Sequence, residues 1–311
     1  MVVEIGSEIR IKNASKELNV WAQENLIIPN PQYRERERRG LWVGNTPKYL
    51  WLYRVDSSDL IVPTGVGKQV RQFLSERDQI SVQLADNDIL EYKGNIPLYD
   101  YQKTAVEAMR RTSCGILQSP CGSGKTQMGI ALAAVLKRKV LWVTHTQDLL
   151  TQSFARAEQY FPAETLGTIT DGKVRLGSHM TFATVQTLSK LDLTQYRDAW
   201  DVVIVDECHR LAGSPTQVTM FYKVMNSLAA RYKYGLSATV HRSDGMIKST
   251  FAVLGPVVYQ VPDEAVADKI MKVRICRRDT GLAINRSCLD TDGTLVYNEL
   301  LSYLGESRER N

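Results

Sequence analysis

The chain has 311 residues, of which 43% are hydrophobic and 23% are charged, with a formal net charge of +5. This composition is ordinary for a globular protein and excludes wholesale disorder, and the length allows two domains. The sequence pI of about 8.8 is compatible with a nucleic-acid partner but does not establish one.

The cysteines and the N-terminal residues favour a reducing compartment. The five cysteines are odd in number and include no Cys-x-x-Cys pair, so we expect free thiols instead of a disulfide frame or a zinc site. The first residues lack a basic stretch followed by an apolar one. No apolar run approaches the roughly 20 residues that span a bilayer. We therefore expect a cytoplasmic protein.

The first hundred residues predict a small α+β domain over residues 1–95. Residues 2–11 alternate apolar and polar side chains, as one strand would, and residues 14–24 place Leu18 and Trp21 on one helical face. Two prolines predict an extended segment over residues 27–33. Residues 50–53 are typical of a core strand.

Basic and aromatic side chains are interleaved between residues 31 and 54. Six basic groups against two acidic ones give this stretch a local charge of +4. Basic groups can neutralise phosphates and aromatic rings can stack on bases, so the pattern suits nucleic acid. A solvated charged turn beside a small aromatic core is an equally weighted alternative. The residues are Arg34, Arg36, Arg38, Arg39, Lys48 and Arg54, with Tyr33, Trp42, Tyr49, Trp51 and Tyr53.

The strongest pattern lies at residues 115–126. An apolar run predicts a buried strand, a glycine-rich loop follows, and residues 126–136 contain strong helix formers without proline. This order is typical of a phosphate-binding loop, in which backbone N–H groups surround phosphate oxygens at a helix N-terminus. Lys125 would reach the β- and γ-phosphates of a nucleotide, and the Thr126 hydroxyl would bind Mg²⁺. Ser119 takes the place of the first glycine of the usual pattern. The expected nucleotide contacts are Pro120, Cys121, Gly122, Ser123, Gly124, Lys125 and Thr126.

A second pattern is a pair of acidic residues directly after the apolar run of residues 202–205. The two carboxylates would lie at the edge where α/β sheets bind ligands. Asp206 would hold Mg²⁺, and Glu207 would orient and deprotonate an attacking water. A helix N-cap pair is the less favoured alternative. No metal-binding cluster accompanies His209, which we expect to be a polar bridge toward the γ-phosphate.

Polar residues at further strand ends complete the set. The amide of Gln102, ahead of the loop, could contact adenine. Hydroxyls and amides at Thr184 and Gln186 could hold a nucleic-acid backbone or could cap helices. Strands alternate with helical stretches over residues 115–258, which predicts an α/β fold with a mostly parallel sheet and helices on both faces.

As a set, these motifs resemble the first RecA-like domain of a superfamily 2 helicase or translocase, over residues 96–262. The matching pieces are Gln102, residues 119–126, 144–152 and 184–188, the Asp-Glu-Cys-His box at 206–209, and Ser-Ala-Thr at 237–239. The following Arg242-Ser243-Asp244-Gly245 resembles the XPB-like and type III restriction-like branch, whose members also carry a small DNA-binding domain ahead of the motor. Tyr99-Asp100 departs from the Arg-Pro common in that branch.

The resemblance implies a role for each matched residue. Lys125, Thr126, Asp206 and Glu207 would bind and hydrolyse Mg-ATP, and Gln102 would contact adenine. Nucleic acid, with DNA favoured over RNA, is the implied partner. Its backbone contacts would come from Thr146, Thr184, Gln186 and Arg242, and the coupling of hydrolysis to nucleic-acid binding from His209, Ser237 and Thr239.

Family members also need a second RecA-like domain that carries an arginine finger. Residues 263–311 are expected to be a linker and the start of such a domain, so a second polypeptide could supply the rest. We then expect this chain to bind ATP but to turn it over slowly alone. Two alternatives stay open: a non-motor adaptor or nucleic-acid-binding protein regulated by ATP, and the motor of a restriction or defence complex with its nuclease elsewhere.

Overall fold

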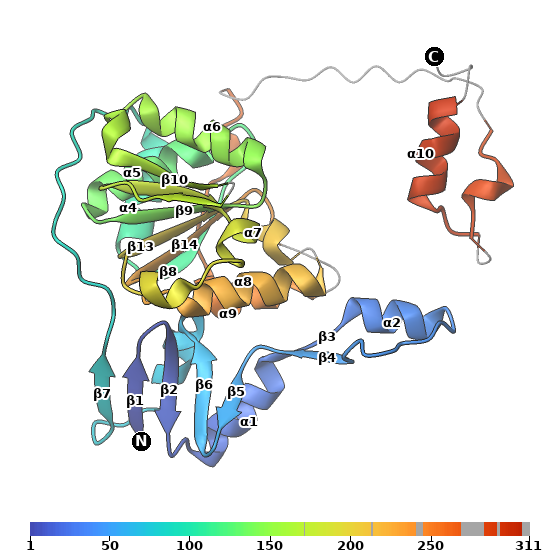
Figure 1. The fold of residues 1–311 in the computed structure, drawn as a ribbon, viewed down its shortest axis with the longest axis horizontal. Helices are drawn as coiled ribbons and strands as arrows, with labels where there is room; N and C mark the ends of the chain where they lie inside the picture. Colours follow the sequence, from blue (N-terminus) through green and yellow to red (C-terminus); the bar gives the residue numbers. More distant parts are fainter. Residues whose placement is uncertain (171, 213, 241–244, 269–282, 291–292, 307–311) are drawn as a thin grey trace. The chain divides into compact units, whose positions relative to one another are not determined.

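The computed structural model describes residues 1–170, 172–212, 214–240, 245–268, 283–290 and 293–306. The chain divides into two units, Met1–Ile270 and Met271–Asn311 (Figure 1). The first unit contains two large sheets, one before residue 83 and one after residue 113.

The N-terminal sheet has five strands in the order β5-β6-β2-β1-β7. Its strands are β1 Val2–Ile5, β2 Glu8–Lys12, β5 Arg54–Asp56, β6 Asp59–Pro63 and β7 Gln79–Val82; its helices are α1 Lys16–Asn25 and α3 Gly67–Arg71. The prediction of one strand over residues 2–11 is wrong, because the chain reverses at Gly6, whose N–H donates to Glu8 O over 2.9 Å. Residues on both sides of this turn then pair antiparallel.

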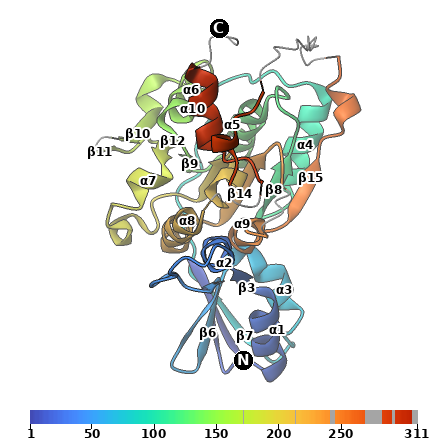
Figure 2. The same ribbon diagram turned by 90° about the vertical axis from the view of Figure 1, so that its right-hand side faces the viewer.

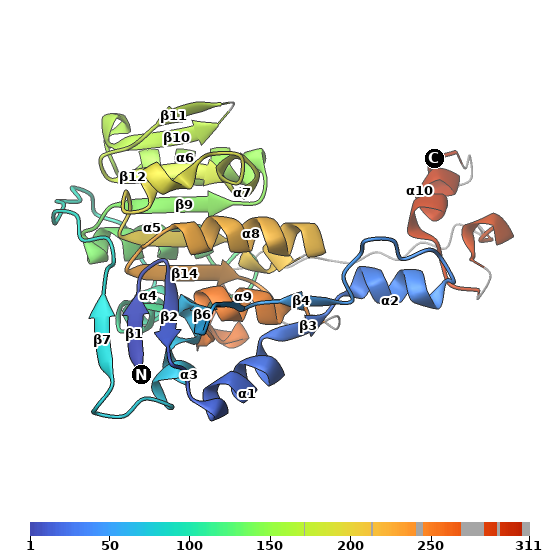
Figure 3. The ribbon, with the colours of Figure 1, turned by 60° about the horizontal axis from the view of Figure 1, so that its bottom comes forward.

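A two-stranded arm extends from this sheet and is formed by β3 Ile27–Pro29, α2 Pro31–Arg38 and β4 Tyr49–Trp51 (Figure 3). The predicted extended segment over residues 27–33 is correct only as far as Asn30. Pro31 is the first helical residue, a position where its fixed φ and missing N–H carry no penalty. The core strand predicted over 50–53 is also only partly correct, because Leu52 is buried while Trp51 is exposed.

The second sheet has eight strands in the order β11-β10-β12-β9-β13-β14-β8-β15. All neighbours pair parallel except β10 and β11, so the predicted mostly parallel α/β fold is confirmed. The antiparallel strand β11 forms one edge of the sheet and was not predicted from the sequence. The strands are β8 Cys114–Gln118, β9 Val140–Thr144, β10 Leu166–Thr170, β11 Lys173–Arg175, β12 Met180–Thr184, β13 Val202–Asp206, β14 Tyr232–Ser237 and β15 Val257–Gln260.

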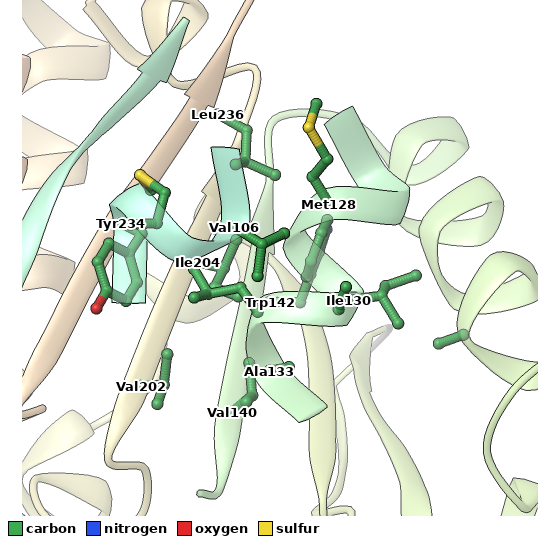
Figure 4. Packing of buried hydrophobic residues seen from close by; sticks show 14 of the residues in the cluster. Val106, Met128, Ile130, Ala133, Val140, Trp142, Val202, Ile204, Tyr234 and Leu236 are labelled. Carbon is green, nitrogen blue, oxygen red and sulfur yellow. The ribbon is translucent and has the colours of Figure 1, made fainter. Parts of the chain in front are cut away.

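Helices cover both faces of this sheet (Figures 1 and 2). One face carries α4 Asp100–Arg110, α5 Lys125–Leu136 and α6 Gln147–Glu158; the other carries α7 Val185–Leu188, α8 Pro215–Ser227 and α9 Ile247–Leu254. Successive strand residues point to opposite faces, so Val140 and Trp142 join one core while Leu141 and Val143 join the other (Figure 4). Two covered faces explain why these strands are continuous apolar runs. Short 3₁₀ segments are Thr64–Val66, Ala163–Thr165, Leu193–Tyr196, Cys208–Ala212 and Asp263–Ala265.

The N-terminal sheet packs against α8 and α9 in a third apolar core, to which these helices and the N-cap of α9 contribute Val218, Met246 and Ala252. The Lys233 ammonium on β14 donates to Ser7 O over 3.1 Å. Residues 83–99, between β7 and α4, form no helix or strand. The domain boundaries at residues 95 and 262 remain predictions.

In the second unit, a 3₁₀ turn at Arg286–Cys288 precedes α10 Tyr297–Glu306. Residues 269–282, within the expected linker, lie outside the described residues. Across the part of the chain that the structure describes, no helix has both the length and the apolar character to cross a bilayer.

Candidate functional site

The predicted phosphate loop joins β8 to α5. Gly122 and Gly124 adopt the left-handed backbone region, with φ of 77° and 82°. A Cβ on Gly124 would lie 2.6 Å from Nε2 of Gln102, so a side chain is excluded there by space as well as by backbone conformation. The helix then begins at Lys125, which leaves the first N–H groups of α5 at the loop.

Ser119, which replaces the usual first glycine, is fully buried in the loop. Its hydroxyl donates to the Ser123 hydroxyl over 2.5 Å, and its backbone N–H donates to Ser237 O over 2.9 Å. The small side chain therefore fits, and it also joins the two ends of the loop. This pair was not predicted from the sequence, because nothing in the pattern indicates that the two hydroxyls meet.

Gln102 joins α4 to the same loop. Its Oε1 accepts from Tyr99 N and its Nε2 donates to Ser123 O, each over 2.9 Å. The Tyr101 hydroxyl donates to the same Ser123 carbonyl over 2.9 Å. A side-chain amide nitrogen carries two donor hydrogens, so one remains for a ligand. The adenine contact of Gln102 remains a prediction beside this structural role.

Asp206 ends β13 and is only 4% exposed. Its Oδ1 accepts from Glu207 N at 3.0 Å, and its Oδ2 accepts from the Ser153 hydroxyl at a long 3.4 Å. Burial, followed by repulsion from Glu207, raises the pKa of Asp206 to about 6. A buried carboxylate with such weak donors favours a cation close by.

A line of polar contacts crosses the edge of the sheet from the loop to the end of β14. Lys125 Nζ, 8% exposed, lies 3.4 Å from Glu207 Oε1, and Glu207 Oε2 lies 3.3 Å from His209 Nδ1. His209 Nδ1 in turn lies 2.8 Å from Ser237 Oγ. Ser237 Oγ donates to Thr239 O and accepts from Thr239 N. Glu207 itself has a φ of 48°, a left-handed conformation rare for its residue type and common at functional sites.

Two cavities flank this line of contacts. The larger, of about 510 Å³, has the size of a small-molecule site and is formed by α4, the loop, α6 and the end of β13. The smaller, of about 390 Å³, includes Cys121, Thr146, Glu207, His209 and Thr239. The larger is lined by Pro97, Leu98, Tyr99, Gln102, Gly124, Thr126, Gln127, Leu149, Gln152, Ser153, Arg156 and Asp206. Ser153 in the middle of α6 and Arg156 in its last turn were not predicted from the sequence.

The donor set fits magnesium. The Asp206 carboxylate and Thr126 line the same cavity, and Mg²⁺ prefers oxygen ligands, often one or two from the protein with the rest from phosphates and water. In the described ranges no cluster of three or more His, Cys, Asp and Glu side chains forms a separate metal site.

Three of the four predicted nucleic-acid contacts have local roles as well. Thr146 and Thr184 are the N-caps of α6 and α7, accepting from Leu149 N and Thr187 N. Gln186 Nε2 donates to His145 O over 2.9 Å, which joins the ends of β9 and β12. Helix capping, one of the alternatives, is therefore present at both threonines. Arg242 lies outside the described residues.

Comparisons with known proteins show which family and which fold this chain is similar to. Residues 95–242 match the family model described as type III restriction enzyme, res subunit. The DNA 3'-5' translocase XPB2 of Sulfurisphaera tokodaii is 31% identical over 215 residues, 67% of this chain and 46% of that protein. The DNA 3'-5' helicase XPB of Mycobacterium tuberculosis is 24% identical over 225 residues, 67% of this chain and 40% of that protein.

A solved structure shares the fold. The UvsW helicase from bacteriophage T4 aligns with a TM-score of 0.59 at 19% identity, over 84% of this chain and all of that one. Residues 95–311 number 217 of the 311, so a likeness over 84% must include residues of the N-terminal segment.

The loop, the paired carboxylates and the parallel sheet define the class as α/β proteins with a nucleotide-binding RecA-like domain. Within that class, the matched part of the chain is similar to the XPB-like and type III restriction-like branch of the DEAD/DEAH-like superfamily 2 helicases. The chain spans less than half the length of the two curated relatives it is compared with.

Proposed function

We propose that this chain is the ATP-binding part of a nucleic-acid helicase or translocase, with Mg²⁺ as its metal ion. The line of contacts from Lys125 through Glu207 and His209 to Ser237 carries the proposal. It connects a phosphate loop to the strand end that, in this branch of helicases, couples hydrolysis to nucleic-acid binding. A site built only to bind nucleotide would have no use for such a connection.

Each residue of the line has a defined task in the proposal. ATP supplies the phosphoanhydride bond whose cleavage drives movement. Lys125 would leave Glu207 to bind the β- and γ-phosphates, and Asp206 with Thr126 would hold Mg²⁺. Glu207, no longer paired with Lys125, would accept a proton from the attacking water. The resulting change at Glu207 would reach Ser237 and Thr239 through His209.

DNA is the favoured polymer, since both curated relatives are named for action on DNA. Thr146, Glu207 and Thr239 line one cavity, which supports a backbone contact by Thr146 close to the proposed base. A second RecA-like unit, from a partner or from another segment, would supply an arginine finger. Such a finger raises rates by roughly 10³–10⁵-fold in GTPases, so we expect slow turnover without it.

The test is steady-state ATP hydrolysis with and without single-stranded DNA, duplex DNA and RNA. The proposal predicts that DNA stimulates ATP turnover by the wild type. Turnover should be lost in Glu207→Gln and retained in Glu158→Gln, a substitution on the exposed side of α6. Equal turnover in wild type and Glu207→Gln would refute the catalytic assignment. The adaptor alternative would be favoured if the chain bound DNA but did not hydrolyse ATP, and if neither ATP nor Glu207→Gln changed the DNA binding.

A further inference from the structure

A groove runs between the arm and α8, away from the nucleotide site. It consists of two adjoining cavities of about 600 Å³ each. Both are lined by Pro47 and Leu50 of the arm and by Thr219 and Lys223 of α8, so the two form one continuous channel. The sequence motifs predicted no functional role for any of these four residues.

The walls of the groove combine apolar side chains with neutral polar groups, the Lys223 ammonium and the ion pair between Arg54 and Glu8. Hydroxyls, side-chain amides and lysines are the groups that contact sugar and phosphate in nucleic-acid complexes. Lys223 Nζ donates to Ser189 O over 3.1 Å, and an ammonium has three donors, so two are left for phosphate oxygens. The polar wall residues are Gln32, Asn45 and Thr46 from the arm with Ser189, Thr216, Thr219 and Lys223 opposite.

The arm beside the groove presents aromatic rings to solvent. Trp42 is 83% exposed, Trp51 60% and Tyr49 43%. Large apolar rings in water are unfavourable, and Trp51 and Tyr49 also line the groove. Their flat faces suit stacking with bases, which every base sequence allows.

The same arm is positively charged. Residues 30–49 carry five basic and two acidic side chains, and α2 buries none of its residues. Arg39 pairs with Glu35 at 3.1 Å, whereas Arg34 and Arg38 form no ion pair with any residue that the structure describes. Tryptophan, tyrosine and arginine are also enriched in protein interfaces. The excess of unpaired positive charge favours a polyanion instead.

Buried contacts fix the base of the arm. Asn30 is fully buried; its Nδ2 donates to Pro47 O over 2.7 Å and its backbone N–H to Lys48 O over 3.0 Å. Its Oδ1 caps α2 at Gln32 N. These bonds join the two chain segments of the arm between the β3–β4 pair and α2, so this part of the groove wall keeps its position before a ligand binds.

The groove also continues toward the motor. Ser189, in its wall, directly follows α7, whose N-cap is the proposed backbone contact Thr184. A strand lying in the groove would therefore meet the end of β12.

We propose that the groove and the arm bind a single strand of nucleic acid, with phosphates along α8 and unpaired bases on Trp42 and Trp51. The proposal rests on the proposed function only in its choice of nucleic acid as polymer, and it needs no ATP. Binding would be insensitive to sequence, because neither stacking nor phosphate contact distinguishes bases.

The test is fluorescence anisotropy without nucleotide, using labelled oligothymidine and a duplex of equal length at several salt concentrations. Trp42→Ala with Trp51→Ala should weaken oligothymidine binding at least about tenfold. Arg34→Ala with Arg38→Ala should lower the salt dependence of log K by about 0.7 for each phosphate that the arginines no longer neutralise. Lys173→Ala with Arg175→Ala, an exposed basic pair on β11, should change neither quantity.

Three outcomes would overturn the proposal: unchanged binding in the tryptophan variant, equal weakening in the β11 control, or tight binding of the duplex with no dependence on the tryptophans. Near-ultraviolet circular dichroism would verify that the variants remain folded. Failure here is separable from failure of the proposed function. Lys125→Ala should leave oligothymidine binding intact while removing ATP binding, so each claim can fail alone.

Discussion

The Lys125 ammonium lies 3.4 Å from Oε1 of Glu207, and both side chains are largely removed from water. Lys125 is the proposed phosphate ligand and Glu207 the proposed base, so this ion pair joins the two groups that the proposed mechanism uses separately. In that mechanism, phosphate binding to Lys125 would release the Glu207 carboxylate to act as the base.

Removing the carboxylate should strengthen ATP binding. In Glu207→Gln the phosphates no longer compete with Oε1 for Lys125, so we expect ATP affinity to rise several-fold while hydrolysis falls at least about 10²-fold. Calorimetric titration and steady-state hydrolysis measure the two effects. Weaker ATP binding in Glu207→Gln would contradict the competition between phosphates and carboxylate.

Asp206 should destabilise the nucleotide-free protein at neutral pH. Its folded pKa of about 6 lies above the unfolded value of 3.8, so the folded state binds the proton more tightly, and stability falls as pH rises from about 4 to 6. Two pKa units correspond to about 3 kcal/mol. We therefore expect Asp206→Asn to melt at a higher temperature than wild type at pH 7–8 in EDTA.

The advantage of Asp206→Asn should shrink as pH falls toward 4, where wild-type Asp206 is protonated. Thermal unfolding between pH 4.5 and 8 would measure how the difference in melting temperature between Asp206→Asn and wild type depends on pH. Asp88→Asn, at an exposed carboxylate, is the matched control and should stay close to wild type throughout. A pH-independent difference for Asp206→Asn would show that burial of the charge is not its cause.

The hydroxyl pair in the phosphate loop should stabilise the loop. Ser119→Ala leaves the buried Ser123 hydroxyl without its 2.5 Å partner, a loss of about 1–3 kcal/mol. A double-mutant cycle with Ser123→Ala gives the interaction energy between the two hydroxyls. The free energy of unfolding and the ATP affinity are the two quantities measured. Additive effects of the two substitutions would contradict a direct bond.

Lys233 should make the contact between the two sheets depend on pH. Burial lowers the pKa of its ammonium to about 7 from 10.5, so the unfolded state binds more protons between these values, and stability rises with pH across them. Relative to Lys233→Met, wild type should therefore gain stability from pH 7 to pH 10, by up to about 1.4 kcal/mol per unit. Parallel curves for the two proteins in urea unfolding would refute this.

Local chemistry explains which elements the sequence could predict. The loop and the strands β9, β12 and β13 follow from short apolar runs that end in glycine, hydroxyl or carboxylate residues. The hairpin at Gly6 and the strand β11 could not be predicted in this way, because alternation fits one long strand as well as two and an edge strand of three exposed residues has no apolar signal. The start of α2 could not be predicted, because proline at position 31 is compatible with both the first turn of a helix and an extended chain.

Site residues could be predicted where a motif places them close together in the sequence. Lys125, Asp206 and Glu207 were found because strand, loop and helix follow one another directly along the chain. Ser153, which donates to Asp206 from 53 residues away, and the Ser119 contact with Ser237 depend on how the parallel strands are ordered. The order of the strands in the sheet cannot be inferred from a single sequence.

The most direct test of this account is calorimetric titration of the purified chain with Mg-ATP, beside Lys125→Ala and the exposed control Lys173→Ala. We predict one ATP per chain for wild type and for Lys173→Ala, with binding dependent on Mg²⁺, and at least a hundredfold loss for Lys125→Ala. Equal binding by wild type and Lys125→Ala, or no binding by either, would contradict the assignment of this loop as the nucleotide site.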